Sequence, residues 1–567
     1  MKRTKKFLVG FFACLSLLCG SVVFAGCDLD SGNGADNSSS SVEEMGTDGL
    51  DFYPLPDGTY AVAKGLTIYL EEIIIPATYK GKTVSTIAEN AFANAKIKSI
   101  TIPDSVITID DRAFNSCYNL TSVVIGDSVT TIGEGAFEGC NSLTGIAIPD
   151  NVTTIGEYVF RGCSSLTSVT IGDGVTTIGD YAFAGCYSLT GIAIPDNVTT
   201  IGGYVFNGCS NLTSIVIPDG VTMIGDSAFS GCSSLTSVVI PDSVNTIGDG
   251  AFSGCANLTS VVIGDSVNTI GDGAFYGCSN LTSIVIPDSV TTIGERAFYY
   301  CSNLTSVVIP DSVTTIGDSA FEYCTSLTSV SCPAFAVSYI SKSKLQTVVI
   351  TSGDTIGTWA FYNCSNLTSI EIPDSVTTIG ERAFSGCSNL TSIEIPDSVT
   401  TIGDSAFAFC TNLTSIIIPD SVTTIGDDAF QCCLNLTGVE IPDGVTAIGR
   451  LAFEGCRALM SIEIPDNVTT IGFAAFEGCT NLTSVVIGNS VEFIGQYAFR
   501  ACFSLTNIVI PDSVAAIGEG AFEGCNSLTS ITFKGTVEEW NAITKGSSWK
   551  YQVPATKVVC SDGEVTL

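Results

Sequence analysis

Hydrophobic and polar residues recur along most of this chain with a period of 23 residues. One copy, residues 120–140, reads LTSVVIGDSVTTIGEGAFEGC. In every copy a leucine follows a cysteine by three positions, while a phenylalanine and an isoleucine precede that cysteine by three and eight positions. Ten such cysteines run from Cys117 to Cys324 and eight from Cys364 to Cys525, which gives eighteen copies in register. A fixed period of this kind is typical of a solenoid of stacked coils.

The pattern inside one copy predicts which side chains face the interior. Residues 120–125 have the alternation of a short strand, with Ser122 and Val124 outward. Gly-Asp or Pro-Asp then turns the chain. The inward residues of this copy are Leu120, Val123, Ile125, Val129, Ile132, Ala136, Phe137 and Cys140. A single coil cannot bury this set, so stacked coils must share one core.

The predicted fold is an α/β-type repeat solenoid of about 20 coils in the leucine-rich repeat range of periods. We expect short parallel strands on its concave face, with turns and short helical segments on its convex face. The solenoid is assigned to residues 87–527, with a shortened copy at about 327–345, where the leucine spacing falls to 18. Residues 51–86 and 528–567 are predicted to be caps, because the end coils would otherwise expose open edges and apolar faces.

The first 50 residues look like a targeting segment followed by a tether. Four basic residues precede an apolar stretch that ends in Ala25-Gly26-Cys27, after which the chain turns polar. Residues 1–26 are predicted to be a signal peptide and residues 27–50 a flexible tether. The small-small-Cys ending resembles a bacterial lipoprotein signal, which implies lipid attachment at Cys27 and a membrane-anchored protein at the cell surface. An uncleaved signal anchor and plain secretion are the alternatives, and all three export the chain.

A formal charge of −35 and the absence of histidine narrow the classes of function. The 567 residues hold 22 Lys and Arg against 57 Asp and Glu. Nucleic acid is excluded as a partner, because phosphate contacts need clusters of basic residues. Histidine-dependent nucleophilic catalysis and histidine-ligated zinc are excluded too. Catalysis by a pair of carboxylates needs no histidine, but it needs two carboxyl groups with different pKa values. The acidic residues here recur in equivalent surroundings, which cannot give the two members of a pair different roles. We therefore expect no enzyme and no cofactor.

The repeated cysteines and the repeated acidic residues are the two sets of equivalent positions that could bind a metal ion or, for cysteine, form disulfides. The cysteine column is interpreted as buried free thiols, since cysteine behaves as a small hydrophobe, with occasional disulfides or a metal as alternatives. Acidic columns such as Asp127 and Asp150 could recruit Ca²⁺. Aspartate after proline or glycine is also ordinary turn chemistry, and this second interpretation predicts no metal site.

The repeating unit xxIGxxAFxxCxxLTSIxIPDSVT resembles the BspA-type leucine-rich repeat family of bacterial and some protozoan surface proteins, from about Asp57 to the C-terminus. The entry segment and the ending with Trp540 and Trp549 are similar to that family's N- and C-terminal caps. The resemblance implies an exported surface protein that serves in adhesion, including binding to host matrix proteins such as fibronectin and fibrinogen.

The outward strand positions predict where a partner would bind. The column that contains Ser122 is serine, glycine or once asparagine in every register copy. The column that contains Val124 is largely valine in the first half and glutamate in much of the second half. An extended apolar stripe favours an interaction surface, although valine also suits a strand and glutamate also solubilises a face. The partner-binding candidates are Val124, Val216, Val239, Val262, Val285, Val308, Glu371, Glu394, Glu440 and Glu463.

The sequence thus predicts a cell-surface protein that mediates adhesion or protein–protein recognition through its concave face. Because neighbouring coils are so alike, the expected ligand is extended: a fibrous protein, such as one of the host extracellular matrix, or a polysaccharide. Membrane contact is expected only through the N-terminal lipid. The alternative is a structural spacer or a self-associating coat component, and a carboxylate-based glycan hydrolase is the least favoured hypothesis.

Overall fold

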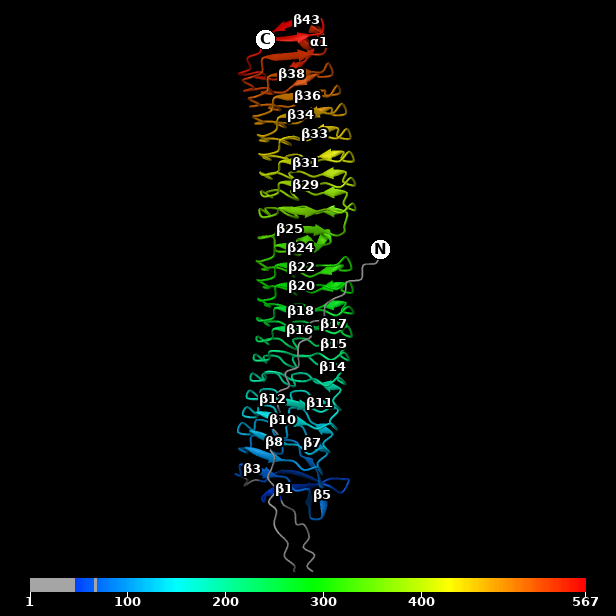
Figure 1. Cartoon of the computed structure of the whole chain (residues 1–567), viewed down its shortest axis with the longest axis vertical. Coiled ribbons are helices and arrows are strands. Elements are labelled where there is room, and N and C mark those ends of the chain that lie inside the picture. Colours follow the sequence, from blue (N-terminus) through cyan, green and yellow to red (C-terminus); the bar gives the residue numbers. More distant parts are fainter. Residues whose placement is uncertain (1–45, 66–68) are drawn as a thin grey trace, which may run out of the picture. The chain divides into compact units, whose positions relative to one another are not determined.

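The computed structural model describes residues 46–65 and 69–567. The chain divides into two compact units, Met1–Glu43 and Glu44–Leu567, and only the second is described here. The predicted signal peptide and Cys27 lie outside the described residues. From Gly46 onward the described chain is a parallel β-solenoid of about 22 turns, which confirms the predicted fold class. The coils follow one another in chain order along the stack (Figure 1).

One side of most coils carries a strand, usually from the LTS segment, and we call these strands the first ladder. The coils around residues 191–194 and 214–217 have no strand on this side, and the coil after β31 (Ser415–Ile417) has only an isolated bridge at Gly438. The first-ladder strands pair in parallel, as in Val239 with Val262 and Ser237 with Ser260, one full repeat apart. Their bounds are β3 Glu72–Ile74, β6 Ser99–Thr101, β8 Ser122–Val124, β10 Gly145–Ile148, β12 Ser168–Ile171, β16 Ser237–Val239, β18 Ser260–Val262, β20 Ser283–Val285, β22 Ser306–Val308, β24 Ser329–Cys332, β25 Thr347–Ile350, β27 Ser369–Glu371, β29 Ser392–Glu394, β31 Ser415–Ile417, β34 Ser461–Ile464, β36 Ser484–Ile487, β38 Asn507–Ile510, β40 Ser530–Phe533 and β42 Lys557–Cys560.

A second side carries very short strands from the Thr-Ile segment, which form the second ladder. It is the more continuous of the two, and one sheet runs unbroken from β1 (Leu50–Pro54) to β23. Its bounds are β2 Tyr60–Lys64, β5 Lys82–Ile87, β7 Thr108–Ile109, β9 Thr131–Ile132, β11 Thr154–Ile155, β13 Thr177–Ile178, β14 Thr200–Ile201, β15 Met223–Ile224, β17 Thr246–Ile247, β19 Thr269–Ile270, β21 Thr292–Ile293, β23 Thr315–Ile316, β26 Thr355–Ile356, β28 Thr378–Ile379, β30 Thr401–Ile402, β32 Thr424–Ile425, β33 Ala447–Ile448, β35 Thr470–Ile471, β37 Phe493–Ile494, β39 Ala516–Ile517 and β41 Thr544–Lys545.

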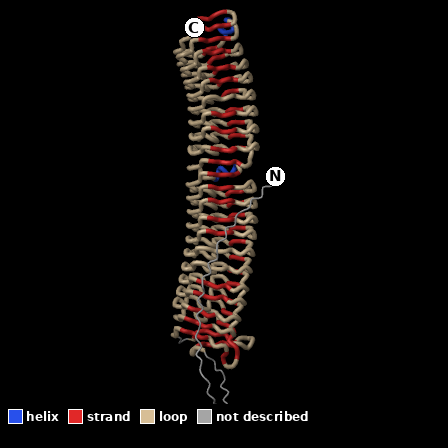
Figure 2. The backbone as a smooth tube through the Cα atoms, in the orientation of Figure 1, coloured by secondary structure: helices blue, strands red, loops and turns tan. Residues whose placement is uncertain are grey.

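The third side, from the Ile-Gly pair to the cysteine, is made of turns, and we call it the turn edge. Its backbone also binds the next coil: the amide of Phe229 donates to the carbonyl of Ala251 at 2.8 Å. Two residues per coil, such as Ser227 and Gly231, are left-handed with φ of 51° and 74°, which prevents a helix from continuing. The predicted short helical segments are therefore turns in the regular coils. Within the described residues, helix occurs only at η1, Ala334–Tyr339, and α1, Val537–Ala542 (Figure 2).

The core lies between these three sides and has the composition that the repeat predicts. All eight inward residues of the copy 120–140 are at most 9% exposed, whereas Val124 is 55% exposed. The phenylalanines of successive coils stack almost parallel, with 5.4 Å between the ring centroids of Phe252 and Phe275. Each ring is thus covered by the equivalent rings above and below it, in the offset arrangement that aromatic pairs favour.

Every cysteine of the described residues is a free thiol, and all but Cys432 are buried. Apart from Cys364, each thiol of the column donates a hydrogen bond to a backbone carbonyl of the preceding coil. The Sγ of Cys255, for example, donates to the carbonyl of Phe229 at 3.2 Å. Cys332 and Cys560, which fall outside the register, are also buried and free.

The regular stack is interrupted between Cys324 and Cys364. Strands β24 and β25 pair Ser329 with Thr347, a step of only 18 residues, so the shortened copy occupies a genuine coil of the solenoid. It has no AFxxC turn; η1 takes that place. Ile340 pairs with Phe321 through an isolated bridge and is buried, so it continues the core where the phenylalanine stack stops.

Antiparallel strands and one helix close the two ends of the stack. At the N-terminal end, β1 (Leu50–Pro54) pairs with β2, and β4 (Thr78–Tyr79) pairs with β5. At the C-terminal end, β43 (Gly563–Thr566) pairs with β42. Helix α1 begins with a capping box between Thr536 and Glu539. Trp540 is 2% exposed and lies against Phe533 and Trp549.

The buried thiols predict that stability falls in alkaline solution. Burial raises the pKa of Cys163 and Cys255 to about 12, from an ordinary value of 9.0. Below pH 9 both the folded and the unfolded chain hold these protons. Between pH 9 and about 12 only the unfolded chain loses them, so each thiol lowers the free energy of unfolding by up to about 1.4 kcal/mol per pH unit.

Denaturant midpoints between pH 8 and 10.5 measure this slope, and the Cys163→Ala/Cys255→Ala variant should show a shallower slope than the parent. The parent and the variant contain the same lysines and tyrosines, so the contribution of these residues to the slope cancels when the two proteins are compared. Equal slopes in parent and variant would contradict the assignment.

Candidate recognition surface

The exposed side chains of the first ladder form one surface, which we call the first-ladder face. Eight of the ten predicted partner-binding residues lie on its strands, and Val216 and Glu440 occupy the equivalent position in coils without a strand there. Val216 is 76% exposed, Val285 66% and Val239 61%, and all four glutamates are exposed. Strand pairing joins the two halves, because Val308 pairs with Ser331, Ser331 with Val349 and Val349 with Glu371. The valine stripe therefore continues into the glutamate stripe across the shortened coil.

The neighbouring threonine column is tied into the scaffold. Thr259 Oγ1 donates to the carbonyl of Thr236 at 3.0 Å, and the same bond recurs in many other coils. These hydroxyls are therefore partly occupied by the backbone of the preceding coil. The side chains of this face that are free to contact a partner are therefore those of the valine and glutamate column and of the serine column beside it.

The first-ladder face is hollowed at two places that the sequence reasoning missed. One hollow of about 600 Å³ is lined by Val216, Val239 and Val262, with Asp219 at its margin. The other, of about 530 Å³, lies among Ile417, Glu440 and Glu463.

The second hollow lies where the first ladder is almost broken, since β31 joins the next coil only through the bridge from Ser415 to Gly438. A Cβ atom at Gly438 would have no neighbour within 4 Å. The sequence does contain one sign of this hollow, because position 438 is glycine where most coils have serine. Gly145 shows why it is weak, because it occupies the same column inside a regular strand.

The acidic columns act as hydrogen-bond acceptors between coils. Asp226 Oδ1 accepts the amide of Asp249 at 2.9 Å, and Asp249 Oδ1 accepts that of Asp272 at 2.8 Å. Each carboxylate thus satisfies a turn amide of the following coil. In the part of the chain that the structure describes, no group of three or more His, Cys, Asp or Glu residues is placed to hold a metal ion.

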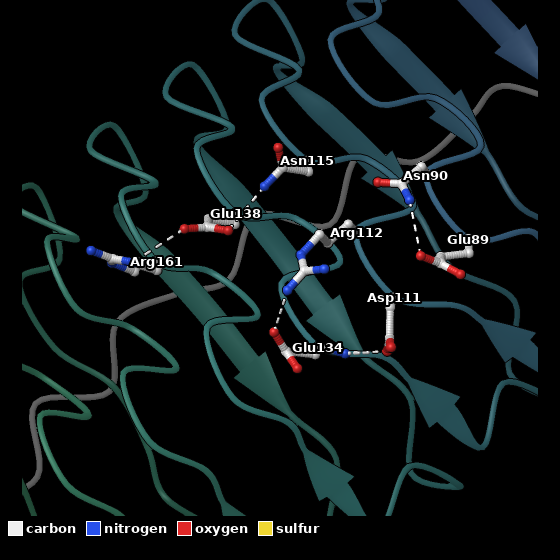
Figure 3. A network of polar contacts seen from close by, with 8 residues as sticks. All are labelled: Glu89, Asn90, Asp111, Arg112, Asn115, Glu134, Glu138 and Arg161. Carbon is white, nitrogen blue, oxygen red and sulfur yellow. Dashed lines mark hydrogen bonds and ion pairs between the residues drawn. The ribbon is translucent and has the colours of Figure 1, made fainter.

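A polar network covers the turn edge of the first coils (Figure 3). Arg112 Nη2 donates to Glu134 Oε1 at 2.6 Å, and Glu138 accepts from Asn115 on one side and Arg161 on the other. These side chains are substantially exposed, and the Arg112–Glu134 pair is 49% and 44% accessible. Exposed pairs of this kind contribute little stability, so the network is a solvated surface that links coils.

Over residues 46–65 and 69–567, the structure contains no helix long and apolar enough to cross a membrane.

The fold and its free surfaces define a leucine-rich repeat solenoid that displays its variable side chains on a rigid strand ladder. The family described as the BspA-type leucine-rich repeat region matches in six overlapping copies that together span residues 85–544. The chain belongs to this family. Proteins of this family and fold are generally not enzymes.

Several solved structures are similar. A leucine-rich repeat protein from Bacteroides ovatus is 30% identical, with 74% of this chain and 94% of that chain covered and a TM-score of 0.47. A leucine-rich cell surface protein from Faecalibacterium prausnitzii is 26% identical over 89% and 99% of the two chains, with a TM-score of 0.23. The pneumococcal vaccine antigen PcpA is 18% identical over 60% and 94%, with a TM-score of 0.36. No functionally curated protein matches the sequence.

The acidic columns predict a modest loss of stability when one carboxylate is removed. In Asp249→Ala the amide of Asp272 loses its acceptor, and we expect the free energy of unfolding to fall by about 0.5–1.5 kcal/mol. Asp249→Asn keeps an oxygen at the same position and should lose less. Urea denaturation at pH 7 compares the two, and an equal loss in both variants would show that the acceptor is not what matters.

Proposed function

We propose that this protein is an exported bacterial surface protein that recognises an extended ligand through the first-ladder face and thereby mediates adhesion. The observation that carries the proposal is the exposed valine column that continues, in strand register, into an exposed glutamate column. Monomeric proteins rarely display so long an apolar stripe without using it. Membership of the BspA-type family supports recognition or adhesion in general.

The repeat spacing favours a long ligand over a small one. Adjacent first-ladder strands lie about 4.8 Å apart, as strands in a sheet do, so successive outward side chains form a row. Either an extended polypeptide or a polysaccharide can follow such a row. A host extracellular matrix protein with exposed fibrous segments is the partner we propose first.

The two halves of the row favour different contacts. In the first half, Val239, Val262 and Val285 offer an apolar strip that would bury apolar side chains or the apolar faces of sugars. In the second half, Glu394 pairs directly with Ile417, so one apolar side chain stands between two pairs of carboxylates. That mixture suits a segment that carries lysine or arginine, because opposite charges steer association and fix register.

We further propose that the chain is tethered to the cell membrane by acylation of Cys27, with a signal anchor or secretion as the alternatives. Several acyl chains would give stable attachment, whereas one gives only marginal binding. Acylation would place the recognition solenoid, from about Asp51 onward, outside the cell.

The proposal is tested by the binding of the unit Glu44–Leu567 to immobilised fibronectin, fibrinogen and a panel of polysaccharides. A variant with lysine at Glu371, Glu394, Glu440 and Glu463 should lose at least tenfold in affinity for a ligand that uses the second half of the face. The matched control has the same charge change on the turn edge, at the exposed residues Glu157, Glu295, Glu381 and Glu519.

Saturable binding that the first variant loses and the control keeps supports the proposed face. Equal losses in both variants would mean that net charge alone drives the binding. If no probe binds and sedimentation shows concentration-dependent assembly, the near-identical coils serve as a self-associating coat or spacer instead.

A further inference from the structure

The turn edge beside the shortened coil differs from the rest of that edge. Because the shortened coil has no AFxxC turn, the edge is hollowed there by about 440 Å³. Asp318, Ser319 and Glu322 line the hollow from the preceding coil, and Ser338, Tyr339 and Ser341 line it from the shortened coil. Its walls therefore offer carboxylates and hydroxyls, and its volume falls within the roughly 300–1,000 Å³ of small-ligand sites.

Exposed tyrosines gather next to this hollow. Tyr300 stacks on Tyr323 with 4.7 Å between ring centroids, and Tyr299 meets both rings edge-on at 4.7 and 5.1 Å. Tyr276 extends the cluster by stacking on Tyr299 at 5.4 Å. Tyr276, Tyr300 and Tyr323 remain 38–46% exposed. Tyr323 directly follows Glu322, which lines the hollow, so the cluster adjoins the hollow in the sequence.

Two of these tyrosines occupy positions that disfavour a bulky residue. Tyr300 and Tyr323 immediately precede the cysteine, where their φ angles are 60° and 58°. The three preceding coils have Gly231, Gly254 and Gly277 there, with φ of 69–74°. A side chain in this left-handed region costs on the order of 1–2 kcal/mol. The core does not require these rings, since they are half exposed. Other coils also place a non-glycine residue at this left-handed position, such as Asn363 and Phe409, so the exposed rings and not the backbone strain distinguish this region.

The far side of the shortened coil repeats the same combination. A second hollow of about 570 Å³ is lined in part by Phe335, Ser338, Thr358 and Ala360, and it shares Ser338 with the first. Trp359, between the last two of these residues, is 41% exposed and meets Tyr362 edge-on at 4.5 Å. Helix η1 is thus flanked by two hollows, and partly exposed aromatic residues are adjacent in sequence to residues that line both. One face of the Trp359 ring is covered by the guanidinium of Arg382, 4.7 Å from the ring centroid.

We propose that this region is a binding site for a neutral oligosaccharide of pyranose sugars. One face of a pyranose ring is made of C–H groups that pack on an aromatic ring, while its hydroxyls donate to carboxylates and exchange hydrogen bonds with serine. Asp318 and Glu322 disfavour anionic ligands such as phosphates or uronic acids. A cage for an organic cation would need open space between its rings, but Tyr300 and Tyr323 are already stacked on each other.

This site is separate from the first-ladder face, so it does not depend on the function proposed above. It also needs no chemistry beyond binding. Two hollows that share Ser338 across η1 give room for more than one sugar unit, and the ligand is therefore an oligosaccharide rather than a single sugar.

Calorimetric titration of the full chain with maltohexaose, cellohexaose, xylohexaose and chitohexaose tests the proposal. We expect saturable binding of at least one of them, weakened at least tenfold in Tyr300→Gly/Tyr323→Gly. Glycine is the residue that the repeat itself prefers there, so the melting temperature of this variant should be unchanged or higher. Tyr158→Gly/Tyr181→Gly is the matched control, since it removes another stacked pair of left-handed tyrosines from the same edge.

Retention of binding in the control, and in the lysine variant of the first-ladder face, places the site at the shortened coil. The proposal is overturned if none of the four oligosaccharides binds, or if the glycine variant binds them as well as the parent. Saturable binding of tetramethylammonium in their place would make the site a cation cage. Self-association that only the parent shows would make the tyrosines a contact between copies of the chain.

Discussion

The structure depends on contact between coils, because no coil can bury its own apolar residues. A phenylalanine such as Phe252 is covered above and below by the rings of the neighbouring coils, and its backbone amide bonds to the next coil. Hydrogen bonds on three sides and a shared core act over the same 23-residue step. They fix the register, because a slip of one residue would turn every inward strand side chain outward. The same dependence explains why both ends of the stack need additional strands.

This constraint divides the chain into residues that cannot vary and residues that can. The inward columns hold the stack together, and the acidic and threonine columns bind backbone groups of adjacent coils. Free side chains remain in the outward column of the first ladder, at the tips of the turn edge, and at outward positions of the second ladder such as Met223 and Phe493. Recognition must therefore use these positions. The departures from regularity that matter are found there: the change from valine to glutamate, the glycine at 438, and the tyrosines at 300 and 323.

The sequence predicted what depends on the period, and it missed what depends on local hydrogen bonding. The inward and outward residues of the copy 120–140 follow from spacing, and the structure buries and exposes them as predicted. The cysteines of the column are buried free thiols, and β24 pairs with β25 at a step of 18 residues. The turn edge was expected to hold short helices. It does not, because residues such as Ser227 and Gly231 are left-handed, and Ser227 has no obvious signature of that conformation. The two hollows of the first-ladder face arise where strand pairing weakens, which no residue pattern marks reliably.

A perfectly regular stack can display only a repeated pattern, so it is suited to ligands that repeat. A single, distinct site requires a break in the pattern, and the shortened coil is the largest break in this stack. The break has a physical cost: the phenylalanine stack stops at Phe321, and Ile340 replaces it with a smaller side chain. Strained tyrosines stand beside it where glycine would be easier. A scaffold whose stability comes from repetition can carry such a cost in one coil, since the coils on either side keep their own contacts. The shortened coil therefore has less local stability than the regular coils, and in return it presents a surface that the regular coils cannot form.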